Sequence, residues 1–415
     1  MASRRRRSSK APLVVFLLIV VAAGAFFLWR TYRPQVTPAT TATLHAVRFA
    51  DLPGWKDSDA RAALSAFRRS CSVLKNKPQN SAMGENGYAG IVGDWQSACN
   101  ALPTASTAAA ARQFFEQHFA PVEIAPDGGA ALFTGYYEPE LDASRTQGGA
   151  YKTPIYAAPP NLVSVDLGAF RGKYAGEHLE GCLAGHKLLP CASRAQIDAH
   201  GLANAPVLLY AKDPISVFFL HIQGSGRVKL ADGTMLRIAY DGQNGRPYTA
   251  IGHTLIERGL LPREGMSMQA IRAWMKTHPA LARNVMESDK SYVFFKEEPI
   301  GDAALGSPGS EGVPLTPGAS LAVDTRLHPL GVPVYVAATR PDADPAKPDR
   351  AFDALLIAQD TGGAIRGPAR GDVFWGFGPD AESIAGRMKS TGRMFVLLPK
   401  AVAAKLPPNA QLAAP

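Results

Sequence analysis

Residues 357–376 read IAQDTGGAIRGPARGDVFWG, and no other stretch constrains the fold and the chemistry so closely. Two aspartates, Asp360 and Asp372, lie among five glycines, one proline and two arginines. Glycine at this density predicts sharp turns, or a backbone that lies close against a large neighbour. Asp372 leads directly into Val-Phe-Trp, and apolar surroundings disfavour a charged carboxylate and raise its pKa toward that of a proton donor. The alternative for each aspartate is a turn residue in a tight β connection.

The composition around this stretch indicates a folded protein with many turns. The chain has 415 residues, of which 46% are hydrophobic and 19% are charged. These proportions are typical of a globular protein, and the length allows two domains. The 39 glycines and 33 prolines favour many turns, and therefore many short strands.

Short apolar segments predominate after residue 131, and a few helical patterns lie among and before them. Expected strands are 207–210, 217–222, 334–336, 355–358 and 394–398. Helices are expected where apolar residues recur every three or four positions, at 64–71, 108–119, 251–258 and 267–276. The sequence therefore predicts a mostly β protein with a small helical fraction.

The net charge of +9 originates almost entirely at the N-terminus. Seven of the 44 basic residues and none of the 35 acidic residues precede Pro34, so the remainder of the chain is nearly neutral. No basic stripe interleaved with aromatic residues is visible in the sequence. A nucleic-acid partner is therefore not expected.

An unbroken apolar run at residues 11–29 follows the basic leader. As a helix it would be about 28 Å long, close to the ~30 Å hydrocarbon core of a bilayer. Basic residues ahead of the run predict a cytoplasmic N-terminus and export of the rest. We expect an uncleaved membrane anchor, and the alternative is a cleaved signal peptide with small residues at 22–25 near the cleavage site. The Pro/Thr-rich residues 34–44 are expected to form a spacer.

Four cysteines become interpretable if the chain is exported. An oxidising compartment favours disulfides, and four cysteines allow three pairings. The local pairing, Cys71–Cys99 with Cys182–Cys191, closes the shortest loops and is the one we expect. Neither CxxC nor HExxH occurs, so a metal site is not predicted. Four buried free thiols would be less compatible with export.

Three further segments combine aromatic rings with polar groups and glycine. They are residues 133–139 (FTGYYEP), 221–228 (HIQGSGRV) and 240–248 (YDGQNGRPY). Sugars need this combination, because their C–H faces stack on rings and their hydroxyls require many hydrogen-bonding groups. Turn residues and core tyrosines are the alternative for any one segment. Together the three predict a saccharide-binding cleft.

These segments, together with SYVFF, GVPLTPGASLAVD, PLGVPV and AQDTGGAIRG…GDVFWG, resemble the membrane-bound lytic murein transglycosylase A family. The resemblance extends over about residues 45–400. The last part is similar to the 3D domain, which is named for three aspartates that here match Asp324, Asp360 and Asp372. Just before Asp372 this chain has Arg370-Gly371, where some members have Gln-His. It also lacks the lipoprotein cysteine of well-known members, which is why we expect a peptide anchor.

The fold implied by the resemblance is a double-psi β-barrel assembled from two chain segments, 45–139 and 295–400. A smaller β-barrel domain, residues 140–294, is inserted between them, and glycan would lie in the groove between the two domains. Outside these domains we expect a basic stub with the membrane anchor at 1–33, the spacer at 34–44 and a flexible tail at 401–415.

The activity implied by the resemblance is cleavage of the β-1,4 bond between N-acetylmuramic acid and N-acetylglucosamine without water, leaving a 1,6-anhydromuramoyl end. The family's catalytic aspartate matches Asp372, and Asp360 and Asp324 are expected to shape the site and orient it. No cofactor or metal is implied. The residues expected to bind glycan are Thr134, Gly135, Tyr136, Tyr137, Gln223, Gly224, Ser225, Gly226, Tyr240, Gln243, Asn244, Gly362 and Gly363.

A single carboxyl group suffices for this reaction if the nucleophile is the C6 hydroxyl of the substrate itself. Asp372 would first donate a proton to the leaving oxygen and then accept the C6 proton. The alternatives are a muramidase with Asp360 as second carboxylate, and a module that binds peptidoglycan without cleaving it. Asp360 or Glu138 would be the acid if Asp372 were not. We expect a monomer in the periplasm of a Gram-negative cell, with glycan strands, the membrane and cell-wall synthesis complexes as partners.

Overall fold

The computed structural model describes residues 41–104, 107–174 and 178–413. The expected membrane anchor at 11–29 and the basic stub lie outside these ranges. Within them, no helix has both the length and the apolar character needed to span a bilayer.

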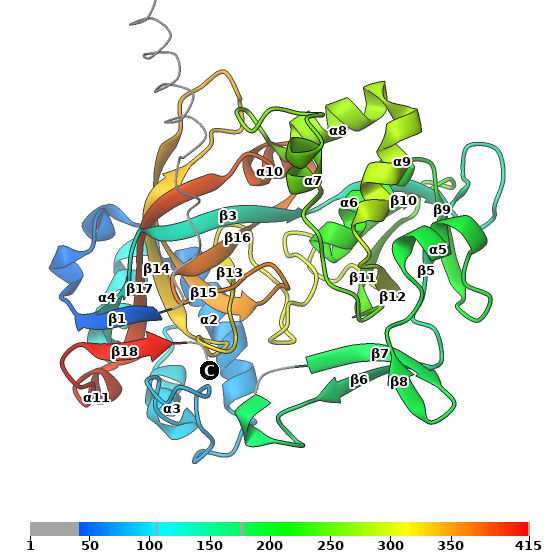
Figure 1. The fold of residues 1–415 in the computed structure, drawn as a ribbon. Coiled ribbons are helices and arrows are strands. Elements are labelled where there is room, and N and C mark those ends of the chain that lie inside the picture. Colours follow the sequence, from blue (N-terminus) through cyan, green and yellow to red (C-terminus); the bar gives the residue numbers. More distant parts are fainter. Residues whose placement is uncertain (1–40, 105–106, 175–177, 414–415) are drawn as a thin grey trace, which may run out of the picture. The chain divides into compact units, whose positions relative to one another are not determined.

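Six strands close into a barrel in the order β14-β15-β13-β16-β3-β17, and β17 pairs back with β14 (Figure 1). Two of the pairs, β13–β15 and β16–β3, are parallel, and the other neighbours are antiparallel. The strands are β3 (Ala131–Glu138), β13 (Ser320–Val323), β14 (Pro333–Arg340), β15 (Arg350–Asp360), β16 (Arg370–Phe377) and β17 (Lys389–Pro399).

The predicted fold class is confirmed. The protein is mostly β, and one strand of the barrel, β3, comes from a segment that precedes the other five by almost half of the chain. The parallel pairs are consistent with a double-psi topology. The apolar segments predicted at 334–336, 355–358 and 394–398 lie in β14, β15 and β17, where their side chains form much of the barrel core.

The sheet extends beyond β17 through β2 (Phe119–Pro126), β1 (Thr41–Ala46) and β18 (Ala410–Ala413). The flexible tail predicted at 401–415 was therefore wrong for the described part, because a short helix, α11 (Lys400–Ala403), and then β18 follow the barrel. Backbone pairing with β1 and burial of Leu412 hold this end in place. The beginning of β1 also lies within the segment expected to be a spacer.

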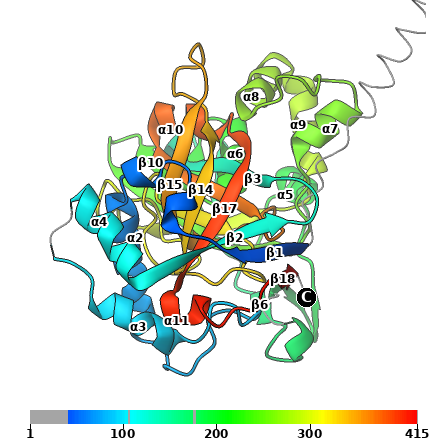
Figure 2. The same cartoon turned by 90° about the vertical axis from the view of Figure 1, so that its left-hand side faces the viewer.

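Helices α2 (Arg61–Leu74), α3 (Val92–Asn100) and α4 (Ala108–His118) lie together along one side of the barrel (Figure 2). Their apolar faces pack into the barrel core, and Phe67 meets the rings of Phe114 and Phe115. The Cys71–Cys99 disulfide joins α2 to α3. A fourth helix, α10 (Gly378–Ala385), packs against β3 and β16.

The inserted part contains a six-stranded sheet in the order β12-β11-β10-β4-β9-β5 and a smaller sheet in the order β6-β7-β8. The Cys182–Cys191 disulfide links β7 to the segment after β8, so both disulfides have the expected pairing. The strands are β4 (Glu140–Ser144), β5 (Thr153–Tyr156), β6 (Leu162–Asp166), β7 (His178–Ala184), β8 (Lys187–Leu189), β9 (Val207–Ala211), β10 (Ser225–Leu230), β11 (Met235–Gln243) and β12 (Val293–Glu298).

In the described part of the insert, five α-helices accompany these sheets, and β12 runs past the expected domain boundary at residue 294. The helices expected at 251–258 and 267–276 are both present, as α7 and α8. The five are α5 (Arg194–His200), α6 (Pro214–Gln223), α7 (Ile251–Glu257), α8 (Met268–Thr277) and α9 (Pro279–Ser288).

The strand predicted at 217–222 was wrong, because this segment belongs to helix α6. Asp213 caps the N-terminus by accepting hydrogen bonds from two backbone N–H groups, Pro214 occupies the first turn, and Gly224 ends the helix at φ 81°. One face of α6 contributes to the core of the six-stranded sheet, and another contributes to the core formed with α7, α8 and α9. A helix buried on both sides has no polar stripe, so its period is hidden in the sequence.

Candidate functional site

A cleft of about 380 Å³ lies where the barrel meets the inserted sheet. The barrel contributes β3, the end of β15, β16 and the loop that follows β15, whereas the insert contributes the end of α6, β11 and the start of β12. The predicted site residues that line this cleft are Thr134, Gly135, Tyr136, Gln223, Gly224, Tyr240, Gln243, Asp360, Gly362, Gly363 and Asp372.

Asp372 lies on β16, opposite Thr134 of β3 in the parallel pair. The Thr134 hydroxyl donates a hydrogen bond of 2.5 Å to Oδ1 of Asp372. Burial raises the pKa of the Asp372 carboxyl, and although Arg370 and the Thr134 hydrogen bond oppose this effect, the charge of Asp360 reinforces it. The site therefore favours the protonated acid more than water does.

Asp360 ends β15 and is surrounded by donors. The Ser310 backbone N–H and hydroxyl donate to Oδ1 at 3.0 and 2.9 Å, and the Tyr136 hydroxyl donates to Oδ2 at 2.8 Å. Burial raises the pKa of Asp360, and these hydrogen bonds counteract part of the rise. Tyr136 in turn packs on Phe374, with ring centroids 5.2 Å apart. Both oxygens of Asp360 are thus fixed in position.

Asp324, the third aspartate, is fully buried and does not line the cleft. Its carboxylate accepts hydrogen bonds from Arg326 at 2.6 and 2.9 Å and from the Gly367 backbone at 2.9 Å. Burial alone would raise the pKa of Asp324, but these bonds and the charges of Arg326 and Arg366 outweigh it and hold the pKa below its ordinary value. Asp324 therefore anchors the loop between Asp360 and Asp372.

Four predicted glycan-binding residues lie outside the cleft lining. The Tyr137 side chain packs with Ala381 and Ala385 of α10, and Gly226 lies against Leu220. Asn244 is fully buried, where its side-chain amide makes hydrogen bonds with four backbone groups. The residues that the structure places away from the lining are Tyr137, Ser225, Gly226 and Asn244.

Other lining residues were not predicted as site residues. Among them is His221, whose Nδ1 lies 2.9 Å from Arg194 Nη1. Burial, with the charge of Arg194, holds the pKa of His221 well below its ordinary value, so the ring is neutral. The remaining unpredicted lining residues are Ile222, Tyr248, Ser291, Val293, Ala322, Thr361, Ala364, Ile365 and Arg370.

Glu138 occupies the junction between the barrel and the insert. Its carboxylate is fully buried and accepts hydrogen bonds from Arg227 at 3.0 Å and from Arg237 at 2.6 and 3.2 Å. Both arginines also donate to the backbone of the segment that returns to the barrel, at Leu305. Glu138 is not among the residues that line the cleft, so its position argues against a role as the acid.

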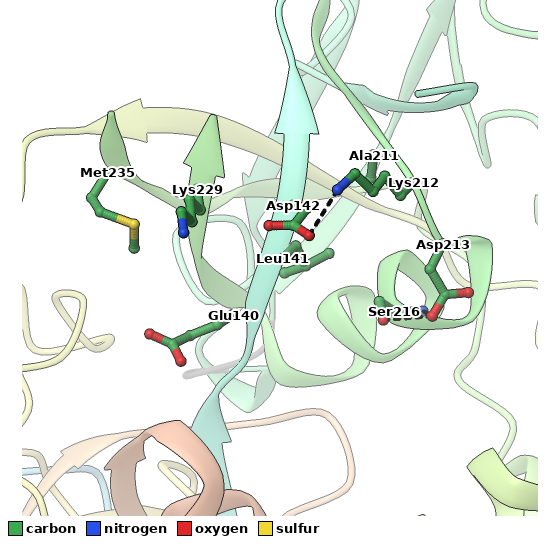
Figure 3. A pocket seen from close by; sticks show the side chains of 9 residues that line it. All are labelled: Glu140, Leu141, Asp142, Ala211, Lys212, Asp213, Ser216, Lys229 and Met235. Atoms are coloured by element: carbon green, nitrogen blue, oxygen red, sulfur yellow. Dashed lines mark hydrogen bonds and ion pairs between the residues drawn. The ribbon is translucent and has the colours of Figure 1, made fainter. Parts of the chain in front are cut away.

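A second hollow lies on the inserted sheet, where Glu140, Asp142, Lys212 and Lys229 project around β4 and β10 (Figure 3). An ion pair of 3.0 Å joins Lys212 to Asp142. None of the predicted site residues lines this hollow. Across the described ranges, no cluster of three or more His, Cys, Asp or Glu side chains is arranged to bind a metal ion.

Two family models match the chain. The MltA specific insert domain matches residues 132–296, and the 3D domain matches residues 319–398. Among curated proteins, membrane-bound lytic murein transglycosylase A of Escherichia coli (strain K12) is 35% identical over 278 residues, covering 66% of this chain and 68% of that protein. The Vibrio cholerae protein of the same name is 34% identical over 272 residues, covering 65% and 66%.

Solved structures show the same relationship. The membrane-bound lytic murein transglycosylase of Agrobacterium tumefaciens superposes with a TM-score of 0.76 at 32% identity, covering 88% of this chain and 99% of that one. MltA from Neisseria gonorrhoeae gives 0.68 at 32%, covering 90% and 95%. Escherichia coli MltA with bound chitohexaose gives 0.63 at 28%, covering 88% and 97%.

Fold and site together define an enzyme with carboxyl groups in a cleft between two β domains. The comparisons are more specific, and the chain belongs to the membrane-bound lytic murein transglycosylase A family. It is accordingly a lytic murein transglycosylase.

Proposed function

We propose that this protein cleaves the β-1,4 bond between N-acetylmuramic acid and N-acetylglucosamine in peptidoglycan without water, with Asp372 acting first as acid and then as base. The observation that supports this most strongly is the placement of Asp372 in the cleft, where burial raises its pKa and the Thr134 hydroxyl fixes one of its oxygens. The glycan seen in the Escherichia coli relative, chitohexaose, is a chain of the kind that this cleft would hold.

The first step is proton transfer from Asp372 to the glycosidic oxygen. The bond from C1 to this oxygen breaks, N-acetylglucosamine leaves with a new hydroxyl, and oxocarbenium character develops on the N-acetylmuramic acid ring. Burial favours this chemistry because it raises the pKa of Asp372, and the charge of Asp360 adds to the rise. Asp372 is then a carboxylate.

The second step closes the anhydro ring. Asp372 accepts the proton of the C6 hydroxyl while O6 forms a bond to C1, which returns Asp372 to its protonated form. An intramolecular nucleophile can have an effective molarity on the order of 10⁵ M, so no second carboxylate needs to activate water. Asp360 and Tyr136 shape the cleft, and the hydrogen bond from the Tyr136 hydroxyl holds the Asp360 carboxylate in place.

The location belongs to the same proposal. The relatives are named membrane-bound, and the apolar run at residues 11–29 has the length of a membrane anchor. We place the catalytic domains in the periplasm, where they act as a monomer on glycan strands next to cell-wall synthesis complexes. Trypsin treatment of intact spheroplasts tests this, because a periplasmic domain is digested from outside, whereas a cytoplasmic one survives until lysis.

Mass analysis of the products from purified sacculi tests the reaction. The expected product carries a 1,6-anhydro end and is one water lighter than the reducing end that a muramidase would leave. A reducing end would establish hydrolysis instead, and the absence of any product would indicate a binding module.

Asp372→Asn tests the assignment of the acid. We expect this variant to bind glycan as the unmodified protein does and to lose cleavage by a factor on the order of 10²–10⁴, since general acid–base catalysis contributes about that much. Retained cleavage would move the acid role to Asp360. Asp59→Asn is the matched control, because Asp59 is an exposed carboxylate just before helix α2, which packs on the barrel.

A further inference from the structure

Arg370, Thr134 and Asp372 form a chain of hydrogen bonds in the wall of the cleft. Arg370 Nη2 donates to the Thr134 hydroxyl oxygen at 2.7 Å, and that hydroxyl donates to Asp372 Oδ1 at 2.5 Å. Arg370 is buried, with 8% of the residue exposed, and its other terminal nitrogen donates to the Gly371 backbone carbonyl. The guanidinium is therefore fixed in one orientation.

The direction of this chain follows from what each group is able to donate. A guanidinium has donors and no acceptor, so the Thr134 oxygen must accept from Arg370. The hydroxyl has one proton, and among the described residues Asp372 Oδ1 is the acceptor that lies within hydrogen-bond distance of it. A partly buried hydroxyl proton without an acceptor is costly, so the proton points toward Asp372. Oδ1 is thereby occupied as an acceptor.

We propose that Arg370 is a positioning residue that acts through Thr134 to leave Oδ2 of Asp372 as the oxygen that carries the catalytic proton. This inference rests on the proposed function and assigns roles to two residues within it. It also changes the expected role of Thr134, which orients the acid rather than binding sugar.

The charge of Arg370 contributes a second effect. The other ionisable groups that face Asp372 are Asp360 at the end of β15 and Tyr136 on β3, and burial keeps the pKa of Tyr136 well above its ordinary value, so this hydroxyl stays neutral. Arg370 is therefore the cation that opposes burial and Asp360, and it disfavours a proton on the oxygen nearest to it.

A double-mutant cycle tests the coupling between the two residues. Thr134→Val and Arg370→Met are made singly and together, and kcat is measured on soluble glycan strands at a pH where Asp372 is protonated. We expect each single variant to lose about tenfold and the double variant to lose no more than Thr134→Val alone, because Arg370 acts through the hydroxyl. Losses that multiply would overturn the proposal.

Three further variants separate positioning from simple loss of structure. Thr134→Ser retains the hydroxyl and is expected to recover activity to within threefold of the unmodified protein. Arg393→Met removes an exposed arginine of β17 and is expected to change neither kcat nor the melting temperature by much. Arg370→Lys retains the charge without the planar fork, so the pH dependence should be retained while kcat falls. Failure of the serine variant to recover activity counts against the proposal.

A ¹³C NMR titration of the Asp372 carboxyl needs no substrate and gives a readout independent of turnover. Removing a cation raises a carboxyl pKa, so Arg370→Met should move the titration, and the alkaline limb of activity, to higher pH. An unchanged titration in a folded Arg370→Met protein contradicts the inference. A further outcome is that the unmodified protein yields no anhydro product although Arg370→Met still shifts the Asp372 titration. That result would overturn the proposed function and still support the hydrogen-bond chain from Arg370 to Asp372.

Discussion

At the scale of single residues, the three aspartates of the 3D segment have three different surroundings. Asp372 faces the cleft with one donor on Oδ1, and Asp360 has donors on both oxygens. Asp324 is buried with arginine and a backbone N–H group. The pKa is raised for Asp372 and Asp360 and lowered for Asp324. The three aspartates that give the 3D domain its name therefore have different surroundings and different physical roles.

Asp324→Asn is predicted to destabilise the protein by about 2–4 kcal/mol near neutral pH, because it removes one partner of a buried ion pair. The pKa of Asp324 is lower in the folded protein than in the unfolded chain, so its contribution is present above the unfolded pKa of about 3.9 and is lost as pH falls through the folded value. Urea unfolding of both proteins from pH 7 to pH 2 measures this.

The two unfolding free energies should therefore converge at low pH. The control is Asp59→Asn, since Asp59 forms an exposed ion pair with Arg61 and such pairs contribute about 0–1 kcal/mol. A constant difference between Asp324→Asn and the unmodified protein at every pH would show that packing, and not charge, is responsible.

At the scale of elements, the two disulfides close loops of different length. Cys71 and Cys99 are 28 residues apart, and Cys182 and Cys191 are 9 apart. Loop-closure entropy predicts a loss of about 3.5 kcal/mol for removing the first and about 2.5 kcal/mol for the second. Chemical unfolding of the Cys71→Ser/Cys99→Ser and Cys182→Ser/Cys191→Ser proteins checks the order. A larger loss for the shorter loop would contradict it.

The last strand offers a second test at this scale. Leu412 of β18 is 1% exposed, and Leu412→Ala is predicted to cost about 2–3 kcal/mol through the lost burial and the cavity that remains. Gln411→Ala is the matched control, because Gln411 lies on the exposed face of the same strand. Thermal unfolding compares the two. Equal, small effects would mean that this end of the chain contributes nothing to the sheet.

Elements marked by a short apolar segment or by a helical period were predictable, whereas a helix that is apolar on all sides was assigned the wrong type. Strands β14, β15 and β17 and helices α2, α7 and α8 appear where the apolar pattern placed them. Helix α6 was mistaken for a strand because it is apolar on all sides, although Asp213-Pro214 and Gly224 were available as capping signals. The tail was mistaken for a flexible segment because its stability comes from pairing with β1, a contact between opposite ends of the sequence.

The candidate site could be predicted where its residues lie on one motif. Asp360, Asp372 and the glycines between them were found together because they are close in sequence. His221 lies in a segment that was predicted to form the cleft, but it was not named as a site residue, since its position depends on Arg194 and on the packing of α6. Asn244 and Tyr137 were predicted to bind glycan because buried junctions and sugar-binding sites use the same types of polar and aromatic residue. The sequence alone does not separate the two roles.

At the scale of the whole molecule, the barrel and the insert meet through Glu138 and its two arginines. Glu138→Gln is predicted to cost about 3–5 kcal/mol, because Arg227 and Arg237 would remain buried without a countercharge. Since these residues hold the walls of the cleft together, we also expect weaker glycan binding. Calorimetric titration with chitohexaose and urea unfolding measure the two effects.

Glu297→Gln is the control for this variant, because Glu297 pairs with Arg145 at an exposed position of the six-stranded sheet that also carries Arg227 and Arg237. It is expected to cost less than about 1 kcal/mol. A Glu138→Gln protein that unfolds and binds as the unmodified one does would show that the junction does not depend on this carboxylate.

The barrel is assembled from distant parts of the polypeptide, and this has a consequence for biosynthesis. Strand β3 leaves the ribosome long before β16 and β17, the neighbours between which it is inserted. The hydroxyl of Thr134 and the carboxyl of Asp372, which are 238 positions apart, meet only when nearly all of the chain has emerged. If Asp372 is the acid, as we propose, a prematurely terminated product contains no working active centre, and a cell that makes such fragments is not exposed to uncontrolled damage of its own wall.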